Sequence, residues 1–342
     1  MRKIENSELL KQKFKDYTIG LFENRDFPHP KDALAALLID ERAVLYNLTE
    51  KQIDDYINKI IDQYDEIILA DQTKMLELIA EFEIIIPAKK IKKKFSEDIV
   101  DAMRYNALRE KEFIKLVQEI GIKTCVYCHA QLTVVMNKKY YERNFKDLGV
   151  NKGDVRVLRG LLELDHRHPK SKYPFLSTCV YNLYPVCGNC NRVKSKSDSN
   201  FDLYTDSDDL EVFSFSVNKT SAIDCMILKD SSLIKIDINS INISDKDSQD
   251  YLEMFDIKEI YDTQKDIVEE LLHKKVVYND KYKKELHDEF RSLFPNQSMI
   301  DRLIIGNYDQ PNDIYKRPMA KFVQDIARDI ELIKPLPKKL KS

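Results

Sequence analysis

Two pairs of cysteines constrain the fold of this chain more than any other sequence feature. Cys125 and Cys128 form one C-x2-C pair, Cys187 and Cys190 form a second, and 58 residues separate the pairs. Two residues between cysteines let both sulfurs reach one ion from a tight turn, and two such turns complete a tetrahedral zinc site. A closed four-thiolate site has no open coordination position, so we predict a structural Zn²⁺. The alternative is four unrelated buried cysteines.

The composition favours a helical protein and leaves its function open. The chain has 342 residues, of which 33% are charged and only seven are glycine, and its formal net charge is −3. This length allows two or three domains, and nucleic-acid contacts would need a local basic patch because the chain is not basic as a whole. There is no apolar stretch of 18 residues and no apolar core of a signal peptide at the N-terminus. We therefore expect no membrane span and a cytoplasmic location, where cysteines stay reduced and bind metal.

Hydrophobic periodicity divides the chain into three predicted domains. Residues 1–118 carry apolar side chains at three- and four-residue steps, which predicts a helical domain. Residues 119–203 concentrate glycine, proline and cysteine, and loop residues interrupt their short apolar segments. Residues 204–342 begin with alternating segments and continue with helical periodicity. The fold class we predict is α+β and mostly helical.

Local signals place several boundaries within these segments. Thr49 stands where a helix cap is expected, and Pro87 is expected to end a helix. Residues 211–217 and 233–238 alternate apolar with polar side chains, which predicts two strands of a β-hairpin or small sheet. A lysine run at 89–94 is a solvated helix face or, alternatively, a stripe that binds phosphate.

The segment between and around the cysteine pairs carries a second pattern. It reads Leu164-Asp165-His166-Arg167-His168-Pro169-Lys170, then Tyr181-Asn182-Leu183, and finally Cys190-Asn191-Arg192-Val193-Lys194. This order closely resembles the HNH endonuclease family of the four-cysteine subtype. The resemblance implies a central ββα-metal finger that is stapled by the four-cysteine zinc and flanked by helical regions. Its strand would carry Asp165 and His166, and its helix would open near Cys190.

The resemblance also implies a role for each motif residue. His166 would be the general base, because a neutral imidazole can take a proton from water near pH 7. Asp165 and Asn191 would bind a catalytic Mg²⁺ or Mn²⁺, since oxygen ligands suit hard cations. Asn182 would hold the loop and orient His166. Family members commonly carry histidine where this chain has Asn191, which favours magnesium or manganese over zinc at the catalytic position. Asn182 is alternatively a turn residue, and Asn191 a helix cap.

Basic residues surround this motif and are candidates for phosphate contacts. The alternative is that these charges serve solubility. The candidates for substrate binding are Arg167, Lys170, Lys172, Arg192 and Lys194, with Lys196 close behind. We expect His168 to face solvent, and His129 to lie either close behind the metal ligands or at the surface.

The flanks suggest a setting for the activity. The C-terminal segment resembles the tail of bacterial HNH proteins found beside antiviral defence genes, such as the nuclease subunit of Septu-type systems, which works with an ATPase partner. The chain has no G-x-x-x-x-G-K-[ST] motif, so an ATPase or sensor protein would supply energy or sensing. We expect a DNA endonuclease that does not bind membranes, and because one such site cuts one strand, a double-strand break would need an oligomer or two cleavage events. The alternatives are an RNase of the same fold and a catalytically silent, zinc-stapled module that binds nucleic acid.

Overall fold

The computed structural model describes residues 2–22, 27–38, 43–109, 111–139, 155–195, 201–241 and 244–335. It is α+β and mostly helical, as predicted. The contacts between residues in space divide the chain into two compact units. The N-terminal unit comprises Ile4–Ile122 and Thr133–Asp208, and the C-terminal unit comprises Met1–Lys3, Lys123–Leu132 and Asp209–Ser342. No described helix is long and apolar enough to cross a membrane.

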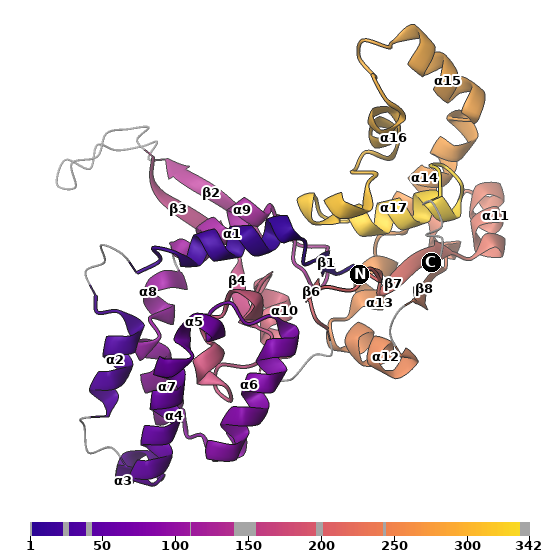
Figure 1. The fold of residues 1–342 in the computed structure, drawn as a ribbon. Helices are drawn as coiled ribbons and strands as arrows, with labels where there is room; N and C mark the ends of the chain where they lie inside the picture. The colour runs from indigo at the N-terminus through magenta and orange to yellow at the C-terminus, as the bar shows by residue number, and fades with distance from the viewer. Residues whose placement is uncertain are drawn as a thin grey trace. The chain divides into compact units, whose positions relative to one another are not determined.

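Helices dominate the first part of the N-terminal unit (Figure 1). Thr49 caps one of them through a capping box with Gln52, as predicted, and another ends two residues before Pro87, as predicted. Gly121 takes the left-handed conformation that closes a third, with φ of 84°. The helices are α1 (Glu8–Thr18), α2 (Pro30–Leu37), α3 (Ala43–Tyr46), α4 (Glu50–Asp62), α5 (Tyr64–Ile67), α6 (Gln72–Ile85), η1 (Ala88–Lys90), α7 (Lys93–Ala102), α8 (Tyr105–Arg109) and α9 (Glu112–Ile120).

The strands of this unit form three two-stranded sheets among the described residues. β1 (Ile4–Glu5) pairs in parallel with β6 (Tyr204–Thr205), and β2 (Val134–Lys139) pairs antiparallel with β3 (Val155–Leu161). β4 (Glu163–His166) pairs antiparallel with β5 (Leu183–Val186), which places Asp165 opposite Tyr184. β5 leads directly into α10 (Gly188–Lys194), so the segment with the predicted catalytic residues is strand, strand and helix in chain order.

The connection between β4 and β5 is part of the core of the N-terminal unit. It contains η3 (Pro174–Leu176) and η4 (Val180–Asn182). Phe175 stacks on Phe82 of α6, with 4.0 Å between ring centroids, and Tyr56 of α4 lies edge-on to Phe175 at 6.2 Å. All three rings are buried. The N-terminal helices therefore hold the loop of the β4–β5 pair by apolar packing.

Hydrogen bonds to the backbone fix the same connection at both ends. The Val180 amide donates to the Ile68 carbonyl at 3.1 Å. The Ser96 hydroxyl of α7 donates to the Lys170 carbonyl at 2.9 Å. Because buried carbonyls and amides are costly to leave unpaired, these bonds make the helical segment a structural part of the β4–β5 region.

The C-terminal unit combines a small sheet with helices. β7 (Phe213–Val217) pairs antiparallel with β8 (Ile236–Ser240), which confirms the small sheet predicted from the alternating segments. The strands do not form a tight hairpin, because α11 (Lys219–Leu228) and η5 (Ser231–Leu233) lie between them in the chain. The remaining elements are α12 (Asp245–Met254), α13 (Ile257–Asp262), α14 (Lys265–Val277), α15 (Asp280–Glu289), α16 (Gln297–Ile305), η6 (Pro311–Lys316) and α17 (Ala320–Asp329).

Helix α17 covers β7 by both apolar and polar contacts (Figure 1). Phe322 of α17 packs edge-on against Phe215 of β7 with ring centroids 5.2 Å apart. Asp325 accepts a hydrogen bond from the Phe215 amide at 3.1 Å, and Asp329 accepts one from the Val217 amide at 2.9 Å. Two carboxylates of the helix thus satisfy backbone donors of the strand.

Candidate metal and catalytic centre

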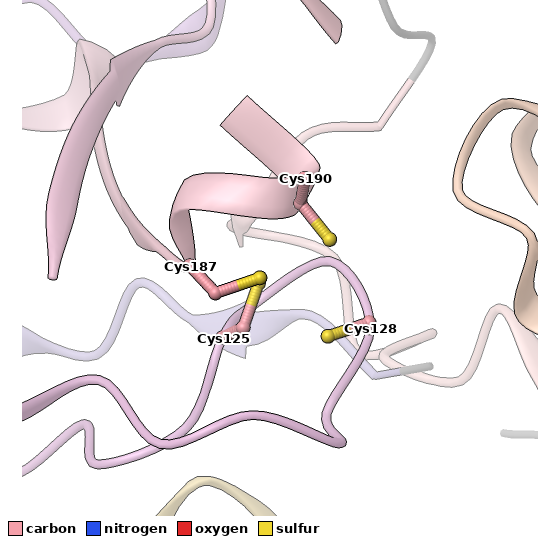
Figure 2. Close-up of side chains that lie close together, drawn as sticks. All are labelled: Cys125, Cys128, Cys187 and Cys190. Atoms are coloured by element: carbon pink, nitrogen blue, oxygen red, sulfur yellow. The ribbon is translucent and has the colours of Figure 1, made fainter. Parts of the chain in front are cut away.

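The four cysteines of the two C-x2-C pairs come together (Figure 2). Their Sγ atoms all lie within 4.8 Å of one another. Zn–S bonds of about 2.3 Å in a tetrahedron place sulfurs roughly 3.8 Å apart, so this cluster fits a metal ion such as zinc. Cys125, Cys128 and Cys190 are buried and Cys187 is half-buried. The predicted four-cysteine cluster is therefore confirmed, and the alternative of four unrelated cysteines is wrong.

Backbone hydrogen bonds shape the turn that carries the first pair. The Cys125 amide donates to the Gln131 carbonyl, and the His129 amide donates back to the Cys125 carbonyl, both at 2.9 Å. His129 takes the left-handed conformation, with φ of 53°, which turns the chain after Cys128. Its imidazole is buried against the Tyr315 ring at 4.9 Å, so the interpretation of His129 as a surface residue is wrong.

Aromatic residues from the C-terminal helices hold this turn within the C-terminal unit. The Tyr251 hydroxyl of α12 donates to the Tyr127 carbonyl at 2.6 Å, and the Tyr261 hydroxyl of α13 donates to the Cys128 carbonyl at 2.8 Å. Phe255 stacks on the Tyr127 ring at 4.4 Å. The sequence patterns gave no reason to connect these residues with the first cysteine pair, which lies more than 120 positions earlier.

A buried ion pair fixes the end of β4 to α10. Asp165 and Lys194 lie 2.8 Å apart between Oδ2 and Nζ, and their side chains are 6% and 0% exposed. The same ammonium donates to the His166 carbonyl at 2.9 Å. Lys194 thus contacts both residues of the Asp-His pair, which makes it an internal counter-charge in this structure, whereas the sequence suggested a phosphate contact.

The environment of His166 keeps its imidazole neutral. The ring is buried, and Nε2 lies 3.0 Å from the Ser177 carbonyl. A carbonyl only accepts hydrogen bonds, so Nε2 carries the proton and Nδ1 keeps the lone pair. Burial, together with the positive charge of Lys170, lowers the pKa of His166 to about 3, although the bond to Ser177 acts in the opposite direction.

Asn182 holds the loop that follows β4. Its Oδ1 accepts from the His168 amide at 2.7 Å, and its Nδ2 donates to the carbonyls of His168 and Leu176 at 3.1 and 3.0 Å. The side chain is fully buried. These hydrogen bonds hold the loop. They connect the chain before Lys170 and after Lys172 to the side-chain amide of Asn182.

Asn191 contacts a residue that the sequence analysis missed. Its Nδ2 donates to Glu163 Oε2 at 2.5 Å. Glu163 lies two residues before Asp165 on β4, and a strand directs such residues to the same face. Likewise Asn191 and Lys194 are three residues apart on α10, which places them on one helix face. The two-residue spacing of Glu163 and Asp165 was the only sequence signal for this contact. It could be used only once Asp165 was known to face α10.

The five predicted substrate-binding residues lie in different environments. Arg167 is buried and its Nε contacts Asp202 at 2.8 Å, and Lys194 is buried as described above. Lys170 is half-buried with Nζ 4.2 Å from the centre of the Tyr105 ring, and burial lowers its pKa. Lys172 is half-buried and Arg192 is exposed.

Two further predictions concern residues around the same loop. His168 is buried, so the expectation that it faces solvent is wrong, and the reason is its position in the loop that Asn182 fixes. Lys196 lies outside the described residues.

The chain matches no protein-family model, no curated protein and no solved structure.

Proposed function

We propose that this chain is a metal-dependent endonuclease of the HNH type that hydrolyses phosphodiester bonds of DNA. One observation carries the proposal: Asp165 and His166 end a strand that pairs with β5, and Lys194 of α10 contacts both of them. Asp165, His166 and Lys194 therefore lie on β4 and α10 of one unit, and Lys194 connects the two elements. The four-cysteine cluster also supports the proposal. Two of its cysteines, Cys187 and Cys190, lie at the start of α10, where a structural zinc would hold the helix in place.

His166 is the proposed general base. The bond from Nε2 to the Ser177 carbonyl leaves Nδ1 to accept the proton of the attacking water. A base with a pKa of about 3 accepts protons weakly at pH 7. A substrate phosphate near Lys170 would offset the positive charge that contributes to this low value, and would so raise the pKa of His166 when the substrate binds. Asn182 would keep the loop that carries Ser177 and Lys170 in place.

Asp165 and Asn191 are the proposed ligands of the catalytic cation. Asp165 offers carboxylate oxygens and Asn191 offers an amide oxygen, and both atom types accept from donors and bind cations. Oxygen donors of this kind suit Mg²⁺ or Mn²⁺. A bound divalent cation would polarise the scissile phosphate and stabilise the leaving oxygen. Lys194 holds Asp165 at the strand end and is proposed as a positioning residue.

The exposed and half-buried cations give the proposed path of the substrate. Arg192 and Lys172 would contact phosphates, which fix a nucleic acid in place without reading its sequence. We retain DNA as the expected substrate and a protein partner, such as an ATPase or sensor, as the expected regulator, both from the family resemblance. An RNase of the same fold is the outcome if only RNA is cut.

The test compares wild type with His166→Ala on supercoiled plasmid DNA and on structured RNA, with Mg²⁺, Mn²⁺ or EDTA. His287→Ala is the matched control, because His287 lies on α15 in the C-terminal unit. Zinc content and thermal unfolding are measured for each protein first. We expect wild type and His287→Ala to cut in Mg²⁺ or Mn²⁺, and His166→Ala to be inert while folded and zinc-loaded.

Two outcomes would contradict the proposal. Equal cleavage by wild type and His166→Ala would exclude His166 as the base. No cleavage of either polymer by wild type, even with proteins co-purified from the host, would favour a zinc-stapled module that binds nucleic acid. Recovery of activity with a co-purified protein would support the proposal and identify the partner.

A further inference from the structure

We propose that Glu163 is a positioning residue of the catalytic cation site: it holds the Asn191 amide so that Oδ1, and not Nδ2, faces the cation. This inference rests on the proposed function. Only the oxygen of an asparagine side chain can bind a cation, because Nδ2 is a donor with no acceptor capacity. Rotation of the amide by 180° would exchange the two atoms, so a site that uses Asn191 needs something to fix the amide.

Glu163 is suited to fix the amide because of its chemistry. Its Oε2 lies 2.5 Å from Asn191 Nδ2. A carboxylate accepts hydrogen bonds and does not donate them, so it can face Nδ2 but repels Oδ1. The flipped amide would place two acceptor oxygens at hydrogen-bond distance with no hydrogen between them. The contact between the exposed Glu163 and the half-buried Asn191 therefore favours one of the two orientations.

The local geometry supports a matched arrangement of two contacts between β4 and α10. Glu163 and Asp165 lie on one face of the strand, and they contact Asn191 and Lys194, which lie on one face of the helix. Each proposed cation ligand is thus held by a neighbour on the opposite element: Asp165 by Lys194, and Asn191 by Glu163. A residue one position away on either element would point to a different side.

Gly188 gives Glu163 the space that this contact needs. A Cβ built on Gly188 would lie 3.0 Å from Glu163 Oε1 and 3.6 Å from Cδ. A contact of 3.0 Å is tighter than most Cβ contacts, so a larger residue at position 188 would require the Glu163 carboxylate to shift by a few tenths of an ångström. Glycine at position 188 leaves the carboxylate where Oε2 contacts Asn191.

The experiment measures Mn²⁺ binding directly, by the electron paramagnetic resonance signal of free Mn²⁺ during titration of the zinc-loaded protein. Glu163→Gln keeps the size of the side chain but can also donate, so the Asn191 amide is no longer fixed. We expect Mn²⁺ affinity to fall roughly 10- to 100-fold, the usual effect of removing a group that orients a metal ligand. Glu253→Gln is the matched control, because Glu253 accepts from the Gln249 amide at 2.6 Å on α12, in the C-terminal unit.

Asn191→Asp separates orientation from direct coordination. Aspartate offers oxygen at both positions and needs no orientation, so Glu163→Gln should reduce Mn²⁺ affinity much less when residue 191 is Asp. We expect a difference of at least about 5-fold between the losses in the two backgrounds, measured as a double-mutant cycle. Equal losses would mean that Glu163 acts on the ion itself, and no loss in either background would mean that it has no role. Glu163→Asp, which retains the charge but is one methylene shorter, should also weaken Mn²⁺ binding when residue 191 is asparagine.

Asp165→Ala distinguishes failure of this inference from failure of the proposed function. If Asp165→Ala abolishes Mn²⁺ binding while it stays folded and zinc-loaded, and Glu163→Gln binds like wild type, the inference alone is wrong. If wild type binds no Mn²⁺, or Asp165→Ala binds it equally well, the proposed cation site is wrong and the inference falls with it.

Discussion

The cations around β4 fall into two groups that have the same charge but different surroundings. Arg167 and Lys194 are buried and paired with carboxylates, whereas Arg192 is exposed and Lys172 half-buried. Removing one member of a buried ion pair leaves an uncompensated charge in the interior. An exposed cation contributes little to stability but can release counterions when it meets a phosphate. A basic residue beside the Asp-His motif can therefore form a buried ion pair within the protein instead of contacting a ligand.

The largest expected effect is on Lys194. Lys194→Met should lower the free energy of unfolding by about 3–5 kcal/mol, because the buried Asp165 loses its counter-charge. Arg192→Met, two positions earlier on the same helix, should change it by no more than about 0.5 kcal/mol because that side chain is exposed. Urea unfolding of both variants measures the contrast. Equal effects would remove the distinction between the two groups.

Neutralising the partner should recover part of that loss. Asp165→Asn in the Lys194→Met protein removes the unpaired charge while keeping the side chain's shape, and should restore about 2 kcal/mol or more. The same change in wild type should be destabilising, since it leaves the Lys194 ammonium unpaired. Additive effects of the two substitutions, measured by urea unfolding, would show that the pair is not coupled.

Arg167 should show an intermediate effect. Its partner Asp202 is 27% exposed, against 6% for Asp165, so water can partly replace the lost contact. Arg167→Gln should therefore lower the free energy of unfolding by about 1–3 kcal/mol, which urea unfolding measures. If the loss equals that of Lys194→Met, partner exposure does not govern the energy of these pairs.

The smallest effect on stability is expected for Arg192 and Lys172, whose substitution should instead change the salt dependence of DNA binding. In the His166→Ala protein with EDTA, Arg192→Gln or Lys172→Gln should each reduce the slope of log affinity for duplex DNA against log salt by about 0.9, with unfolding unchanged. Lys258→Gln on α13 is the control because that lysine is exposed in the C-terminal unit. An unchanged slope in both variants would exclude these cations from the DNA contact.

Features set by local sequence were the ones that could be predicted. Capping chemistry predicted the helix that Thr49 begins, and alternation at 211–217 and 233–238 predicted two strands, which the structure has at 213–217 and 236–240. Cysteine spacing predicted the four-sulfur cluster, because a C-x2-C turn already directs two sulfurs to one point.

Features that depend on the contact between distant elements could not be predicted. The burial of Lys194 follows from the way α10 packs against β4, and no local sequence pattern reveals this packing. The contact of Glu163 with Asn191 has the same origin. Tyr251 and Tyr261 hold the first cysteine turn from more than 120 residues away, and a tyrosine in an amphipathic helix is indistinguishable in sequence from any other core residue. The catalytic roles of the four motif residues stay predictions, and these residues are Asp165, His166, Asn182 and Asn191.

The carboxylates of α17 have a consequence for how this protein behaves in a crowded solution. The outer edge of a strand presents unpaired amides that can template pairing with another chain, which leads to aggregation or strand exchange. On β7, Asp325 and Asp329 already occupy the amides of Phe215 and Val217. A foreign strand would have to displace both carboxylates and would meet their negative charge. Helix α17 therefore blocks strand addition at these amides of β7, in addition to packing on the core.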